Sequence, residues 1–131
     1  MYDLHLRPFH QQLIDVAVQF GKPVMLHSCG GVFPLIPRLI DMGVNILNPI
    51  QPRARGMEPE NLARQFGGRL AFHGGIDIQE LLPRGTPSQV NAETARAAEL
   101  LGRSGGYILA SAHHIQADTP VENVLAMYDV P

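Results

Sequence analysis

Four short polar clusters follow apolar stretches of the chain, and they hold the side chains best suited to chemistry. The first cluster contains His27 and Cys29, separated by one residue, and Cys29 is the only cysteine. The other three clusters contain Asn48 and Gln51, then His73 and Asp77, and finally His113, His114 and Gln116. Ligands of sheets built from βα units bind beyond the carboxyl ends of the strands. We therefore expect the four clusters to form one polar face.

The first cluster has the residue types of a zinc site. Alternate positions at the end of a strand point to the same side, so His27 and Cys29 are expected to lie together. Catalytic zinc takes three protein ligands and keeps one open position. His113, on another strand, completes a candidate set of metal ligands. The alternatives are a packed thiol for Cys29 and a hydrogen-bonded imidazole for His27.

Three residues are candidates for proton transfer. His73 precedes two glycines and Asp77 follows them, so a ligand can approach the backbone between an imidazole and a carboxylate. His113 is the third candidate catalytic residue. The alternative for Asp77 is that its carboxylate caps the next turn.

The remaining polar residues are candidates for substrate binding. Asn48 and Gln51 are neutral hydrogen-bonding groups that can orient a substrate, or that can satisfy the backbone of their own loop. His114 and Gln116 are the corresponding candidates in the last cluster. Because His114 directly follows His113, we expect the two rings to point in opposite directions.

Apolar segments alternate with helical patterns, and glycine closes most of the expected helices. The predicted strands are residues 23–26, 44–47, 70–72 and 107–110. This alternation predicts an α/β fold with a parallel sheet and right-handed crossovers. Four such units have two open edges unless a second copy, another half or folded helices cover them.

Helix signals complete the expected pattern. Residues 6–20 follow helical spacing, with Phe9, Leu13 and Phe20 expected in the core. Capping boxes that begin at Thr86 and Thr119 predict the starts of two later helices.

Composition excludes several classes of function. The 131 residues suffice for one domain. The net charge is −2 and the basic residues are scattered, so the sequence contains no basic patch of the kind that binds nucleic acid. No apolar stretch approaches the roughly 20 residues of a membrane span, and the first ten residues are too polar for a signal peptide. We therefore expect a cytoplasmic protein with no membrane partner.

Four motifs together resemble the uroporphyrinogen decarboxylase-like superfamily, which includes cobalamin-dependent methyltransferases that act on thiols. They are His27-Ser28-Cys29-Gly30, Ile46-Leu47-Asn48-Pro49, Phe72-His73-Gly74-Gly75-Ile76-Asp77 and Asp118-Thr119-Pro120-x-Glu122-Asn123. The resemblance implies that residues 1–131 are a single domain of parallel βα repeats, the C-terminal half of a TIM (β/α)8 barrel. It also implies a partner, either a second copy or an N-terminal half-barrel.

This sequence contains residues that are typical of two different chemistries of the superfamily. The thiol methyltransferases hold zinc with a His-x-Cys pair and a later cysteine, and His113 stands where that cysteine is expected. The resemblance thus favours zinc-dependent methyl transfer to a thiol, from a corrinoid carried on a partner protein.

Two alternatives stay open. The decarboxylases of porphyrin biosynthesis carry Gly-His-Gly at the later position, which Ala112-His113-His114 resembles. Such an enzyme would act on a tetrapyrrole without a cofactor. The other alternative is a half-barrel that has no catalytic activity alone and acts only with a partner chain.

Overall fold

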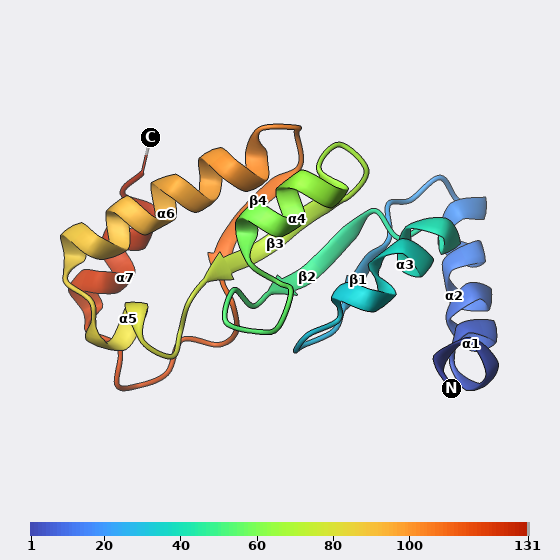
Figure 1. The fold of residues 1–131 in the computed structure, drawn as a ribbon, viewed down its shortest axis with the longest axis horizontal. Helices are drawn as coiled ribbons and strands as arrows, with labels where there is room; N and C mark the ends of the chain where they lie inside the picture. Colours follow the sequence, from blue (N-terminus) through green and yellow to red (C-terminus); the bar gives the residue numbers. More distant parts are fainter. Residues whose placement is uncertain (131) are drawn as a thin grey trace.

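The computed structural model describes residues 1–130 and contains a four-stranded parallel sheet (Figure 1). The strands are neighbours in the order of the chain: β1 (Met25–His27), β2 (Ile46–Ile50), β3 (Ala71–Ile76) and β4 (Tyr107–Ser111). Each connection between consecutive strands contains a helix. The predicted α/β fold, with parallel βα repeats that form half of a TIM barrel, is confirmed.

Seven α-helices and one 3-10 helix accompany the strands in residues 1–130. They are α1 (Tyr2–His5), α2 (Arg7–Gln19), η1 (Phe33–Leu35), α3 (Ile36–Met42), α4 (Pro59–Phe66), α5 (Leu81–Arg84), α6 (Pro87–Gly102) and α7 (Val121–Tyr128). In Figure 1, α1 and α2 lie at one end of the molecule and α7 lies at the other. None of these helices has the length and apolar character needed to cross a bilayer.

One face of the sheet is buried under helices. The row formed by Leu26, Leu47 and Phe72 is aligned across β1, β2 and β3, and Leu47 and Phe72 have no exposed surface. These side chains pack with apolar residues of α3 and α4, such as Leu39 and Leu62. The helices therefore cover the face that carries this row.

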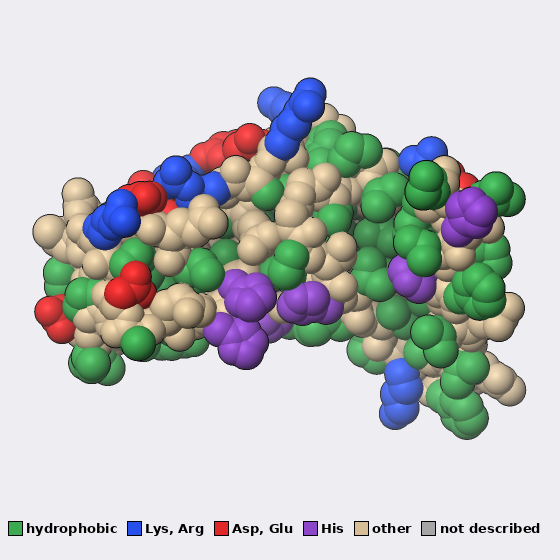
Figure 2. Space-filling view, turned by 90° about the horizontal axis from the view of Figure 1, so that it is seen from below, with side chains coloured by type: hydrophobic (Ala, Val, Ile, Leu, Met, Phe, Trp, Pro, Cys, Tyr) green, Lys and Arg blue, Asp and Glu red, His purple; other side chains and the backbone are tan. Residues whose placement is uncertain are grey.

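The opposite face of the sheet is more open. Met25 and His27 occupy alternate positions of edge strand β1, and both are exposed. Ile108 of edge strand β4 is exposed as well, and it is aligned with His73 of β3. Figure 2 views the molecule from below and shows several histidines gathered near the middle of this side. His27 and His73 directly follow Leu26 and Phe72 along their strands, so their side chains lie on the face away from the buried row.

The prediction that three apolar residues of the first long helix lie in the core was wrong. Phe9, Leu13 and Phe20 are 64%, 73% and 69% exposed, whereas Ile14 is 4% exposed. Ile14 faces the backbone of Gly43, at the end of α3. Helix α2 therefore packs through a narrow strip around Ile14, and no other element in residues 1–130 covers its main apolar face.

Two strands are longer than predicted, because their pairing continues past the apolar residues. β2 extends through Asn48 and a cis peptide bond to Pro49, and β3 extends to Ile76. Polar residues that the sequence placed in loops, including Asn48 and His73, are thus strand residues. Their side chains have the fixed directions of a sheet.

One of the two expected capping boxes is present. Thr86 Oγ1 accepts from Gln89 N–H at 3.3 Å, and Gln89 Oε1 accepts from Thr86 N–H at 2.8 Å. The box predicted at Thr119 was wrong, because Pro120 is the N-cap residue of α7 and makes no side-chain cap. Thr119 lies one residue too early to cap the helix, and its buried Oγ1 has no hydrogen-bond partner within residues 1–130.

Candidate active site at the strand ends

A chain of polar contacts links the ends of three neighbouring strands. Cys29 Sγ lies 3.5 Å from His27 Nε2, just beyond β1. His27 Nδ1 lies 2.5 Å from Asn48 Oδ1 on β2, and Asn48 Nδ2 lies 2.6 Å from His73 Nδ1 on β3. Residues predicted for metal binding, substrate binding and catalysis are thus brought into one line.

Asn48 determines which ring nitrogens carry protons. Its Oδ1 only accepts hydrogen bonds, so the Nδ1–H of His27 donates to it, and the neutral ring keeps a lone pair on Nε2. Its Nδ2–H donates to Nδ1 of His73, so the proton of neutral His73 lies on Nε2. The lone pair of His27 therefore faces Cys29, as a ligand nitrogen should face a shared ion.

The His27 and Cys29 pair fits two positions of a zinc site. Tetrahedral zinc, with Zn–S of about 2.3 Å and Zn–N of about 2.0–2.1 Å, holds such donor atoms about 3.5 Å apart. The separation of Cys29 Sγ and His27 Nε2 is 3.5 Å. Both residues are exposed, so an ion can reach them.

The third predicted ligand is not beside this pair. Among residues 1–130, no group of three or more His, Cys, Asp or Glu side chains is close enough to hold a metal ion. The pair lies at the end of edge strand β1, and His113 follows the opposite edge strand, β4. A role for His113 in metal binding or catalysis stays a prediction.

The two histidines after β4 lie side by side, contrary to the expectation that they point apart. The ring centroids of His113 and His114 are 4.9 Å apart, with the planes tilted by 43°. Strand β4 ends at Ser111, so the alternation of side chains no longer applies at these positions. Ser111 Oγ donates to the His113 carbonyl, and Gln116 Nε2 donates to the His114 carbonyl. Ser111 and Gln116 thus support the loop that presents the two rings.

Asp77 and Gln51 both support loop backbone. The carboxylate of Asp77 accepts from the N–H groups of Gln79, Glu80 and Leu81 at 3.1 to 3.2 Å. Gln51 Oε1 accepts from the Gly30 N–H at 2.6 Å. The contacts of Asp77 match its capping alternative, whereas Gln51 supports the loop after β1 and not its own loop. The catalytic and substrate-binding roles stay predictions.

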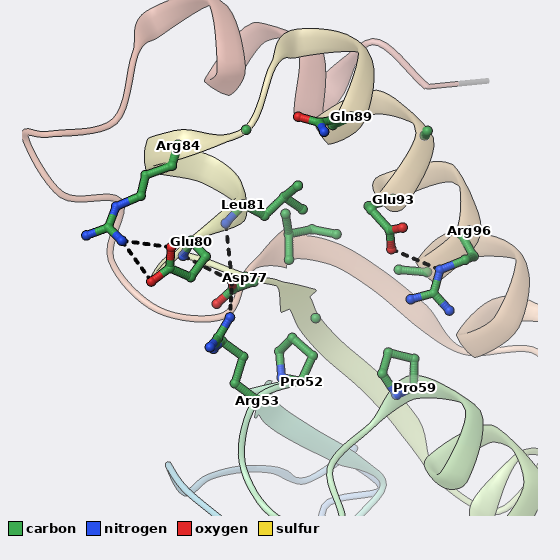
Figure 3. A pocket seen from close by; sticks show the side chains of 15 residues that line it. Pro52, Arg53, Pro59, Asp77, Glu80, Leu81, Arg84, Gln89, Glu93 and Arg96 are labelled. Carbon is green, nitrogen blue, oxygen red and sulfur yellow. Dashed lines mark hydrogen bonds and ion pairs between the residues drawn. The ribbon is translucent and has the colours of Figure 1, made fainter.

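A cleft of about 590 Å³ lies on the helix-covered side, beyond β3, and sequence reasoning missed it (Figure 3). Pro52 and Pro59 line it on one side, and helices α5 and α6 line it on the other. Arg84 is paired with Glu80 at 2.8 Å. The predicted catalytic residue Asp77 lines it as well, beside Arg53. The other lining residues come from separate segments, so the sequence did not group them with Asp77.

Tyr107 is a second feature that the sequence did not indicate. Its hydroxyl donates to the Gly74 carbonyl at 2.7 Å, and burial raises the pKa of Tyr107 to about 12. Tyr107 thereby ties β4 to the glycine pair that follows His73. This contact joins the first residue of β4 to the middle of β3.

A test of that contact uses high pH. The unfolded chain loses the phenolic proton near pH 10, before folded Tyr107 does, so the free energy of unfolding should fall between pH 10 and about 12. We expect Tyr107→Phe to remove this part of the fall, measured by chemical denaturation at increasing pH. The control is Tyr128→Phe, because Tyr128 is 59% exposed. Equal pH slopes in Tyr107→Phe and the unmodified protein would argue against the contact.

Comparisons with known proteins place the chain in a family. Residues 1–130 match the family profile described as uroporphyrinogen decarboxylase (URO-D). The chain is also 30% identical over 120 residues to a methylated-thiol–coenzyme M methyltransferase of Methanosarcina mazei, a match that covers 91% of this chain and 29% of that protein. The chain thus spans less than a third of the length of this relative. Both findings confirm the resemblance drawn from the four motifs, and the protein belongs to the uroporphyrinogen decarboxylase family.

Proposed function

We propose that this protein takes part in zinc-dependent transfer of a methyl group to a thiol. The observation that carries the proposal is the facing pair of Cys29 Sγ and His27 Nε2, 3.5 Å apart, with Asn48 holding the imidazole. The similarity to a methylated-thiol–coenzyme M methyltransferase supports the same chemistry.

His27 and Cys29 would hold zinc together with a third ligand, for which His113 remains the candidate. When bound, zinc lowers the pKa of a coordinated acceptor thiol, so that sulfur is a nucleophile at neutral pH. A corrinoid donor would supply the methyl group and keep the bonding pair as the new sulfur–carbon bond formed, and the thiol proton would leave to solvent.

The chain itself contributes orientation and proton handling. Asn48 accepts from Nδ1–H of His27 and so leaves the Nε2 lone pair of this ring free to hold a zinc ion. His73, with its proton on Nε2, can donate a hydrogen bond to a substrate at the open side of the sheet. Gln51 holds the turn that follows Cys29 through the Gly30 N–H.

The activity is tested by supplying zinc, methylcobalamin and a small thiol, and by measuring thioether formation. We expect methylation that depends on both zinc and Cys29. Uroporphyrinogen turnover without zinc, in the absence of any thioether product, would instead support the decarboxylase alternative. A protein that binds stoichiometric zinc at other residues would contradict the assignment of His27 and Cys29.

Asn48 offers a separate test of the arrangement. Asn48→Leu keeps the side-chain size but removes both imidazole contacts. Loss of a group that orients a zinc ligand typically costs about 10- to 100-fold in metal affinity. We expect a loss of that size, measured by competition with a chromophoric chelator.

The matched control for Asn48 is Asn61→Leu. Asn61 lies on α4, and its side chain is hydrogen-bonded to the Gly56 carbonyl and to Arg64 rather than to an imidazole. Its replacement should leave zinc affinity unchanged. Equal affinities for Asn48→Leu and the control would show that Asn48 does not orient the ligand.

A further inference from the structure

The cleft drawn in Figure 3 has the size and the lining of a binding site for a small molecule. Its volume of about 590 Å³ lies within the range of about 300–1,000 Å³ that is usual for such sites. Two of its lining residues, Ile76 and Ala97, are 1% and 4% exposed, so the cleft reaches down to the core. We call this space the α5–α6 cleft. Its apolar lining residues are Pro52, Pro59, Ile76, Leu81, Ala92 and Ala97.

Helix α5 forms one wall of the cleft, and side chains hold this helix from both ends. At its start, the Asp77 carboxylate accepts from three consecutive backbone N–H groups. At its end, Asn123 of α7 donates through Nδ2 to the carbonyls of Leu82 and Gly85, at 2.9 and 2.7 Å, and Asn123 is only 1% exposed. A helix of four residues is too short to keep its shape by its own hydrogen bonds. These side chains therefore give the cleft a preformed wall, as is usual for small-molecule sites.

Most charged groups that line the cleft already have hydrogen-bond partners. Arg84 Nη1 donates to both carboxylate oxygens of Glu80, at 3.0 and 2.8 Å. Arg96 Nε donates to the Glu93 carboxylate at 2.9 Å. The carboxylate of Asp77 is occupied by backbone N–H groups. The acidic side chains of the lining thus have little capacity left for a cationic ligand.

Arg53 is the exception among these charged groups. Its Nη1 lies 3.8 Å from Asp77 Oδ2, which is beyond hydrogen-bond distance, so the two side chains interact by charge alone. The Arg53 side chain is 56% exposed, and Figure 3 shows it extending toward Asp77, beside Pro52. A guanidinium has five N–H donors in a plane that matches a carboxylate. Arg53 therefore offers an available cation next to an apolar surface.

We propose that the α5–α6 cleft binds a small organic acid. Its carboxylate pairs with the Arg53 guanidinium, and its apolar ring or chain lies against Pro52 and Leu81. One available guanidinium balances a monoanion, which favours a carboxylate over a phosphate dianion. The proposal does not depend on zinc, because neither His27 nor Cys29 lines the cleft.

The site is located with trans-cinnamate, which joins an aromatic ring to one carboxylate. We expect the amide NMR signals of Gly75, Leu81 and Ala92 to shift together and to saturate, with a dissociation constant of about 5 mM or lower. The competing surfaces are the exposed apolar side chains of α2 and α7, such as Leu13 and Leu125. Shifts confined to those two helices, or the absence of any saturable shift, would overturn the proposal.

Arg53→Gln tests the role of the charge. We expect this variant to bind trans-cinnamate about three- to tenfold more weakly, because a partly exposed guanidinium gives a charge pairing of moderate strength. The neutral trans-cinnamamide should bind the variant and the unmodified protein equally. The matched control is Arg55→Gln, since Arg55 is exposed on the same loop but does not line the cleft. Equal affinities of Arg53→Gln and the unmodified protein for trans-cinnamate would contradict the proposal.

Ala92→Trp tests the cleft itself. Ala92 is exposed on α6 and lines the cleft, so an indole at this position can fill the space without disturbing the core. We expect this variant to lose saturable binding of trans-cinnamate and of trans-cinnamamide while its circular dichroism is retained. Ser88→Trp, on the same helix but outside the lining, should bind both as the unmodified protein does. Unchanged binding in Ala92→Trp would show that the acid lies elsewhere and would overturn the proposal.

Discussion

Replacing Cys29 by serine is expected to lower the zinc affinity of this protein by at least about a hundredfold. Cys29 carries the only thiol of the chain, and cysteine sulfur is among the preferred ligands of zinc. Its Sγ lies 3.5 Å from Nε2 of His27, the other candidate ligand of the pair. The measurement is a chelator competition on protein purified without added chelator.

The neighbouring Ser28→Ala is the control for this replacement. Ser28 lies between the two ligands in the sequence and is partly buried, so a general disturbance of the loop would appear in both variants. We expect Ser28→Ala to bind zinc as the unmodified protein does. Retention of full affinity in Cys29→Ser would exclude the thiol as a ligand.

Replacing Phe72 by alanine is expected to lower the free energy of unfolding by about 3–5 kcal/mol, the usual cost of removing a buried phenylalanine. Phe72 has no exposed surface, and it belongs to the core formed with α3 and α4. Chemical denaturation followed by circular dichroism measures the loss. The sheet and the site depend on this residue together, because His73 is the next residue of β3.

Phe72→Leu provides the graded comparison. It leaves most of the buried volume in place, so its loss of stability should be clearly smaller than that of the alanine variant. A loss below about 1 kcal/mol for Phe72→Ala, which is less than the cost of most large core deletions, would show that this core is not what stabilises the sheet.

Most of the fold was predictable because it depends on local patterns. Alternating apolar segments and glycine stops identified all four strands and predicted that they run parallel. The capping box at Thr86 marked the start of α6, since its bonds join residues three apart. The expectation that Phe9, Leu13 and Phe20 lie in the core was wrong for the opposite reason. Helical spacing identifies an apolar face, but it does not identify what covers that face.

The candidate site was predictable in residue types but not in contacts. The His-x-Cys spacing correctly placed the side chains of His27 and Cys29 together. The bridge that Asn48 makes to two imidazoles depends on the register of three strands, which no local pattern encodes. The same holds for Tyr107, whose hydroxyl reaches Gly74 on the neighbouring strand.

X-ray absorption at the zinc edge tests most directly whether His27 and Cys29 bind one ion. We expect the zinc-loaded protein to show one sulfur at about 2.3 Å, together with nitrogen ligands at about 2.0–2.1 Å. The sulfur should vanish in Cys29→Ser. A spectrum of the unmodified protein with only nitrogen and oxygen ligands would contradict the site.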